Sequence, residues 1–148
     1  MKIAPHRPLA TGGALRVAIN LGNPVLARGD AGGASGVSVW LAGQLAAALD
    51  LPMALHTYAS AGAVVAAAAA DAWDMAFLAI DPLRADRIVF SAPYVEIEGT
   101  CVVRVDSTLR AVADIDQPGL RIAVGEGAAY ELFLRRTLRQ GADCSPGG

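Results

Sequence analysis

The chain has 148 residues and a mass of 15.1 kDa, a length typical of one domain. Hydrophobic residues make up 54% of it and charged residues 18%, with a mean hydropathy of +0.42, and this composition excludes a disordered protein. The formal net charge of −2 offers no basic excess to displace the counterions of nucleic-acid phosphates, so we expect no nucleic-acid partner.

Residues 1–14 are predicted to form a leader rich in proline and glycine. Lys2 and Arg7 are basic, but the apolar stretch that a secretory signal requires does not follow them. The two cysteines, Cys101 and Cys144, lack the CxxC spacing of redox or zinc motifs. We therefore interpret both cysteines as thiols.

The first half of the sequence alternates predicted strands and helices. Apolar alternation over Leu15–Ile19 predicts a short strand, and the Gly, Asn, Pro and Asp residues of 20–36 predict a loop. Apolar residues recur every fourth position from Val37, which predicts a helix that ends before Pro52. Met53–Tyr58 is a second strand candidate.

The middle of the sequence continues this pattern. The alanines of Ala61–Asp71 favour a helix, and the nearly continuous apolar run Trp73–Ile80 is typical of a strand buried on both faces of a parallel sheet. Asp81–Arg84 predicts a turn or short helix with proline at a favoured first position. Residues 88–90 and 94–105 are predicted to be extended.

The last third carries a helical turn, a strand and a helix. Val112–Ile115 predicts the turn and Leu120–Val124 the strand. Small residues over Gly125–Ala129 lead into a helix whose end carries three arginines, which suit a helix C-terminus: Arg135, Arg136 and Arg139. Residues 141–148 show no periodicity and are predicted to be a tail. The alternation predicts an α/β fold, a sheet with helices on both faces.

The sequence lacks the residues that several kinds of cofactor and metal chemistry require. Lys2 is the only lysine, which excludes a P-loop or Schiff-base lysine in the folded body, and the two histidines, His6 and His56, cannot build a zinc cluster. Gly125-Glu126-Gly127 begins like a dinucleotide-binding motif but lacks its third glycine. The sequence therefore predicts no cofactor and no metal.

Arg84 is the strongest candidate for a binding residue. It follows the carboxyl end of a predicted buried strand, the edge at which open α/β sheets bind ligands. A guanidinium pairs bidentately with a carboxylate. The alternative is that Arg84 is a solvated helix residue paired with Asp81 or Asp86, and the sequence leaves both interpretations open.

Four segments between Leu15 and Leu138 carry a resemblance to a known family. In sequence order they are "LRVAIN", "SGVSVWLAGQLAAALDLPMAL", "WDMAFLAIDPLR…IVFSAPY" and "CVVRVDS…VADIDQPGLRIAVGEGAAYELFL". Their order resembles that of the amino-acid-type solute-binding proteins of ABC importers. The resemblance implies the type II periplasmic-binding-protein fold, a three-layer α/β/α lobe over residues 15–94, then a crossing strand and the start of a second lobe over residues 95–140.

The resemblance also implies a binding site in a cleft between two lobes that close on the ligand. By position, Arg84 matches the arginine that grips a ligand carboxylate, and backbone N–H groups at a helix N-terminus hold the same carboxylate. The matching positions other than Arg84 are Asn20, Asn23, Ala79, Asp81, Ala128 and Ala129.

This sequence departs from the family in several places. Asn23 stands near the position of an aromatic residue on which amino acids stack, and Asp81 stands where threonine is common. Asp81 could instead neutralise Arg84 or attract a ligand ammonium. The residue that binds the ligand's amino group is expected in a later part of the fold, so we expect an incomplete second lobe and a truncation at the C-terminus. Exposed or swapped sheet edges would then favour a homodimer.

The resemblance implies that the protein binds an amino acid or a related carboxylate as the substrate-binding component of an ABC transporter. It implies an ABC permease as partner and a periplasmic location, although we find no signal peptide in the sequence. One alternative is an enzyme on the same scaffold that resembles cyclohexadienyl dehydratases, with Glu126 as the catalytic acid. Another is a sensory or interaction domain.

Overall fold

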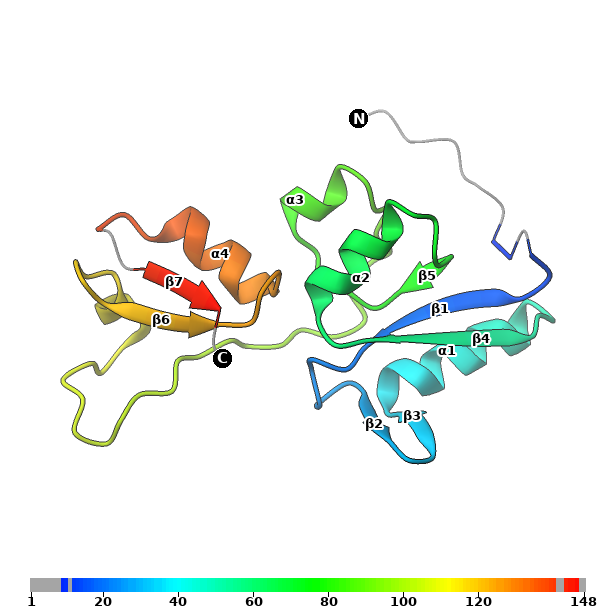
Figure 1. The fold of residues 1–148 in the computed structure, drawn as a ribbon, viewed down its shortest axis with the longest axis horizontal. Coiled ribbons are helices and arrows are strands. Elements are labelled where there is room, and N and C mark those ends of the chain that lie inside the picture. The colour runs from blue at the N-terminus through cyan, green and yellow to red at the C-terminus, as the bar shows by residue number, and fades with distance from the viewer. Residues whose placement is uncertain (1–8, 11, 141–142, 147–148) are drawn as a thin grey trace. The chain divides into compact units, whose positions relative to one another are not determined.

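A computed structural model describes residues 9–10, 12–140 and 143–146 of the chain (Figure 1). The chain divides into two compact units, unit 1 over Met1–Ala79 and unit 2 over Ile80–Gly148. Most of the predicted leader, residues 1–8 and 11, lies outside the described residues. The predicted lobe boundary between residues 94 and 95 falls within unit 2 and stays a prediction.

Unit 1 is built on a parallel sheet of three strands in the order β4-β1-β5. Its central strand is β1 (Leu15–Asn20), flanked by β4 (Met53–Tyr58) and β5 (Met75–Ala76). The predicted strands at the positions of β1 and β4 are confirmed. Because β1 has a neighbour on each side, the interior of this strand is almost completely buried.

Two helices cover opposite sides of this sheet (Figure 1). They are α1 (Val37–Ala48) and α2 (Ala61–Ala68), and both were predicted from apolar spacing and alanine content. The Ser60 side chain accepts a hydrogen bond from Ala63 N at 3.1 Å and so caps α2. The main core of the unit joins β1 to α1 through six buried residues: Leu15, Val17, Ile19, Ala27, Ala42 and Ala46.

A β-hairpin stands where the sequence predicted a loop over residues 20–36. Its strands are β2 (Arg28–Asp30) and β3 (Gly33–Ser35), which pair antiparallel. The Asp30 carboxylate accepts a hydrogen bond from Gly32 N at 2.7 Å, which closes the turn. The residues are small or polar and mostly exposed, so no hydrophobic alternation marks these strands in the sequence.

The predicted strand over Trp73–Ile80 is wrong in its length and burial. Only β5 is a strand, and its side chains are half-buried rather than buried on both faces. Among the described residues β5 pairs with β1 alone, so it is an edge strand with one hydrogen-bonded neighbour. An apolar run favours a strand, but it does not show how many neighbours the strand has or how deeply it is buried.

Unit 2 begins with the short helix α3 (Pro82–Ala85), which was predicted as a turn or short helix. A 3-10 helix, η1 (Val112–Ile115), precedes β6 (Arg121–Val124), and α4 (Ala129–Thr137) connects β6 to β7 (Asp143–Pro146). β6 and β7 are parallel, so the three elements form a βαβ unit. Four residues form its buried core: Ile115, Val124, Leu134 and Cys144.

Two predictions about unit 2 are wrong. The tail over residues 141–148 contains β7, which is extended by a hydrogen bond from Asp143 N to Leu120 O at 2.8 Å; residues 141–142 and 147–148 lie outside the described residues. Residues 88–90 and 94–105 form neither strand nor helix, and the Val102 side chain is 97% exposed. In the described part of unit 2, no strand pairs with residues 88–105 through backbone hydrogen bonds. None of the helices in the described ranges is long and apolar enough to cross a membrane.

Candidate functional site

Arg84 lies in α3, a helix too short to be stable without contacts to its surroundings. Asp81 precedes the helix, and its Oδ1 accepts a hydrogen bond from Leu83 N at 2.9 Å. Pro82 occupies the first helical position, where its missing N–H costs nothing. The dipeptide Asp81-Pro82 therefore starts the helix and fixes the direction in which Arg84 leaves the backbone.

The Arg84 side chain is buried in unit 2, only 3% exposed. Its Nη2 donates a hydrogen bond to the carbonyl oxygen of Gly127 at 2.7 Å, in the turn before α4. This placement contradicts the interpretation of Arg84 as a solvated helix residue. Burial lowers the pKa of the Arg84 guanidinium, and the negative charge of Asp81 opposes that shift. Arginine nevertheless stays protonated at neutral pH, so the buried group carries a full positive charge.

Asp81 pairs with an arginine other than Arg84. Its Oδ2 accepts a hydrogen bond from Arg136 Nη1 at 2.8 Å, near the end of α4. The Asp81 side chain is 3% exposed and the Arg136 side chain 38%. A buried carboxylate is therefore shared between the N-terminus of α3 and a guanidinium that reaches solvent.

The turn before α4 is held by a second carboxylate. The buried Glu131 accepts a hydrogen bond from Gly127 N through Oε2 and one from Arg135 Nε through Oε1, the latter at 3.0 Å. Arg135 also donates to the carbonyl oxygen of Cys144 in β7 at 3.0 Å. Gly127 has a φ of 68°, which favours glycine, so the carbonyl that meets Arg84 comes from a turn that glycine makes possible.

We call these five ionised side chains the α3–α4 cluster: Asp81, Arg84, Glu131, Arg135 and Arg136. Three are guanidiniums and two are carboxylates, so their formal charges sum to +1. Asp81, Arg84 and Glu131 are buried, whereas Arg135 and Arg136 reach solvent, so water screens the charges of these two arginines. The Arg84 guanidinium is the buried positive charge of the cluster, and a carboxylate fits the fork of a guanidinium.

The positions predicted at the α4 N-terminus lie next to this cluster. Ala128 is the N-cap residue and Ala129 the first helical residue. Ala128 N donates to Gly125 O at 3.0 Å, so this N–H group closes a turn in the structure. The proposed carboxylate-binding role of the two alanines stays a prediction.

The remaining predicted site residues belong to unit 1. Asn20 ends β1, and its Oδ1 accepts a hydrogen bond from Gly22 N at 2.9 Å. Asn23 Oδ1 accepts one from Val25 N at 3.2 Å. Both side chains thus shape the loop after β1, while Ala79 is exposed. Their roles in ligand binding stay predictions.

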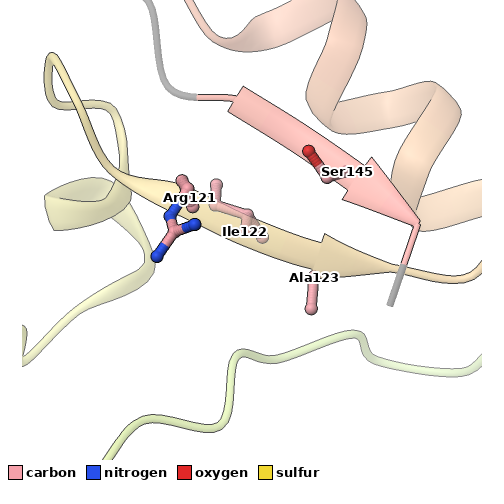
Figure 2. A pocket seen from close by; sticks show the side chains of 4 residues that line it. All are labelled: Arg121, Ile122, Ala123 and Ser145. Atoms are coloured by element: carbon pink, nitrogen blue, oxygen red, sulfur yellow. The ribbon is translucent and has the colours of Figure 1, made fainter. Parts of the chain in front are cut away.

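An open pocket of about 440 Å³ lies at the β6–β7 sheet, lined by residues that the sequence did not single out: Arg121, Ile122, Ala123 and Ser145 (Figure 2). The pocket shares no lining residue with the α3–α4 cluster. In the part of the chain that the structure describes, we find no group of three or more His, Cys, Asp or Glu side chains placed to hold a metal ion.

Sequence reasoning missed Arg136, Glu131 and Gly127 as partners of the predicted site. The spacing of Glu131 and Arg135 is a sequence signal, because residues four apart on a helix face each other. The pair Asp81–Arg136 carries no such signal, because 55 positions separate the two residues in the sequence.

Comparisons with known proteins define the fold. No protein-family model matches the chain, and no curated protein matches it in sequence. Solved structures match over most of the chain, among them three proteins that bind amino acids. The chain thus has the type II periplasmic-binding-protein fold, which confirms the fold class predicted from the sequence.

Three of these structures illustrate the similarity. The ancestral amino acid-binding protein AncCDT-1, a precursor of cyclohexadienyl dehydratase, has a TM-score of 0.75 and 24% identity over 91% of this chain and 61% of its own. A mutant of the arginine-bound ArgBP from T. maritima has a TM-score of 0.75 and 22% identity over 91% and 63%. An inferred binding component of an ABC transporter from Wolinella succinogenes, complexed with lysine, has a TM-score of 0.69 and 21% identity over 92% and 60%. The chain therefore spans about three fifths of the length of these proteins.

Proposed function

We propose that the protein binds a small carboxylate, an amino acid or a related acid, as part of the substrate-binding component of an ABC importer. The observation that carries the proposal is the buried Arg84 guanidinium, held beside the turn before α4 in a cluster with one net positive charge. The matched structures support it, because they are described as amino acid-binding, arginine-bound and complexed with lysine.

Thermal shift against a panel of amino acids and organic acids tests the proposal, followed by calorimetry on each compound that raises Tm. We expect a carboxylate to bind and Arg84→Met to weaken its binding by about 2–5 kcal/mol, the cost of removing one partner of a buried charge pair. Arg87→Met, which removes an exposed guanidinium three residues later, is the matched control and should leave affinity unchanged. An Arg84→Met variant that binds as tightly as the wild type would contradict the proposal.

We extend the proposal to an ABC permease as partner and to a periplasmic location. The support is the W. succinogenes structure, which is described as a component of an ABC transporter. Cell fractionation and cross-linking to the membrane fraction in the presence of the identified ligand test both points. Recovery in the soluble cytoplasmic fraction, without a cross-linked membrane protein, would contradict them.

The second candidate function is dehydratase activity on a cyclohexadienyl substrate such as prephenate. It is favoured by the similarity to AncCDT-1, a precursor of such an enzyme, and by Glu126, an exposed carboxylate in the turn next to Gly127. Turnover of prephenate that disappears in Glu126→Gln would establish it. Binding of prephenate without turnover would favour the binding function over the enzymatic one.

A further inference from the structure

The pairing of Asp81 decides which chemical groups of a ligand the α3–α4 cluster can recognise. Asp81 precedes α3 and Arg84 lies three residues later, so both side chains emerge from one turn. A ligand carboxylate bound at Arg84 would bring an α-ammonium group close to this turn. A free carboxylate of Asp81 would then attract that ammonium group.

In the structure, Asp81 instead forms an ion pair with Arg136. Asp81 Oδ1 is engaged by Leu83 N, and Oδ2 is engaged by Arg136 Nη1 at 2.8 Å. Both oxygens of the buried carboxylate therefore have a donor within unit 2. Because Arg136 is 38% exposed and Asp81 only 3%, loss of the Arg136 side chain would open Asp81 Oδ2 to water and to a ligand.

We infer that Arg136 determines the selectivity of this site: by holding Asp81 Oδ2, it withholds the carboxylate from ligand ammonium groups. The site then binds a carboxylate through Arg84 without contributing an acidic partner for an α-amino group. The inference rests on the proposed function and adds a ligand class to it. The site would recognise the carboxylate group of a ligand and would not discriminate between ligands with and without an α-ammonium group. Arg136 acts through Asp81 and is a specificity-determining residue that does not touch the ligand carboxylate.

Matched ligand pairs that differ only in the α-ammonium group test this role. We would measure the affinities of glutamate and glutarate, and of aspartate and succinate, by calorimetry. In Arg136→Met we expect the affinity ratio within each pair to move toward the ammonium-bearing ligand by about tenfold or more. Arg136→Lys, which keeps a cation of different shape, should move the ratio in the same direction by less.

Arg139→Met is the matched control, because Arg139 follows α4 and binds Asp116 through its backbone N–H. It should leave the ratio unchanged. If Asp81 turns to Arg84 when Arg136 is removed, both ligands of a pair weaken equally and the ratio stays constant, which would overturn the inference. A change of ratio in Arg139→Met equal to that in Arg136→Met would overturn it as well.

A second measurement needs no ligand. Arg136→Met, Asp81→Asn and the double variant form a double-mutant cycle, in which the two single variants together should lower Tm more than the double variant does, because the ion pair is lost only once. Tm changes that simply add would overturn the ion pair and with it the inference. A wild-type protein that shows this coupling but binds no carboxylate of either pair would contradict the proposed function, and the selectivity with it.

Discussion

Asp114 organises the turn that precedes β6 through its two backbone hydrogen bonds. Its Oδ2 accepts the N–H groups of Arg110 at 2.8 Å and Ala111 at 2.9 Å, at the start of η1. Hydrogen bonds to the charged form lower the pKa of the Asp114 carboxyl, with the bond from Arg110 N as the largest cause. A carboxylate whose pKa is lower in the folded chain stabilises the fold above its unfolded pKa and loses that effect as the pH falls through its folded pKa.

We therefore predict a pH-dependent effect of Asp114→Ala. The variant should have a lower Tm than the wild type above about pH 4, near the ordinary pKa of aspartate. The difference should shrink as the pH falls from that value through the lower pKa of the folded Asp114 carboxyl, because the unfolded chain then binds a proton that the folded chain binds only at lower pH. Thermal unfolding of both proteins from about pH 2 to about pH 7 measures it. A Tm difference that is constant over this range would count against the prediction.

At the scale of elements, the sequence predicts those whose own residues carry the periodicity. The apolar spacing from Val37 predicts α1, and Met53–Tyr58 coincides with β4. The sequence does not predict the hairpin of β2 and β3 or the strand β7. Gly, Ser and Asp residues dominate these segments, and they are strands because each pairs with a neighbouring segment. Arg84 was predicted from its place after a strand, whereas its partner Gly127 and the Asp81–Arg136 pair depend on how α3 packs on α4.

The glycine that precedes α1 allows a prediction about the stability of that helix. Gly36 has a φ of 120°, and a Cβ added there would lie 2.6 Å from the Leu26 carbonyl oxygen. Gly36→Ala should therefore destabilise unit 1 by about 1–3 kcal/mol, the cost of a strained backbone, before the close contact is added. Gly43→Ala, inside α1 with nothing within 4 Å of the new Cβ, should instead stabilise the protein by about 0.5–1 kcal/mol.

The two glycine variants form a matched pair, because the same substitution is made at the beginning and in the middle of one helix. Denaturant unfolding that follows the loss of helical signal measures both. A Gly36→Ala variant at least as stable as Gly43→Ala would show that the backbone at the start of α1 relaxes without cost.

At the scale of the whole molecule, unit 2 leaves apolar side chains and strand edges exposed. Val102 and Val105 are almost fully exposed, and Ile97 is 56% exposed, in a segment without regular structure. Among the described residues the sheet of β6 and β7 has two strands, so each strand has one edge without a neighbour. Exposed edges and apolar extended segments are templates for pairing with another polypeptide.

We therefore predict that the protein forms a homodimer in solution, with a mass twice its 15.1 kDa by light scattering at micromolar concentration. Lysine at both Val102 and Val105 should convert it to a monomer, because charged side chains oppose the pairing of an exposed apolar segment. Lysine at Val25, an exposed valine in unit 1, should leave the dimer intact and so controls for added charge. A wild-type protein that stays monomeric up to about 100 μM would refute the prediction, because association follows mass action. A dimer that persists with both lysines would place the contact elsewhere on the molecule.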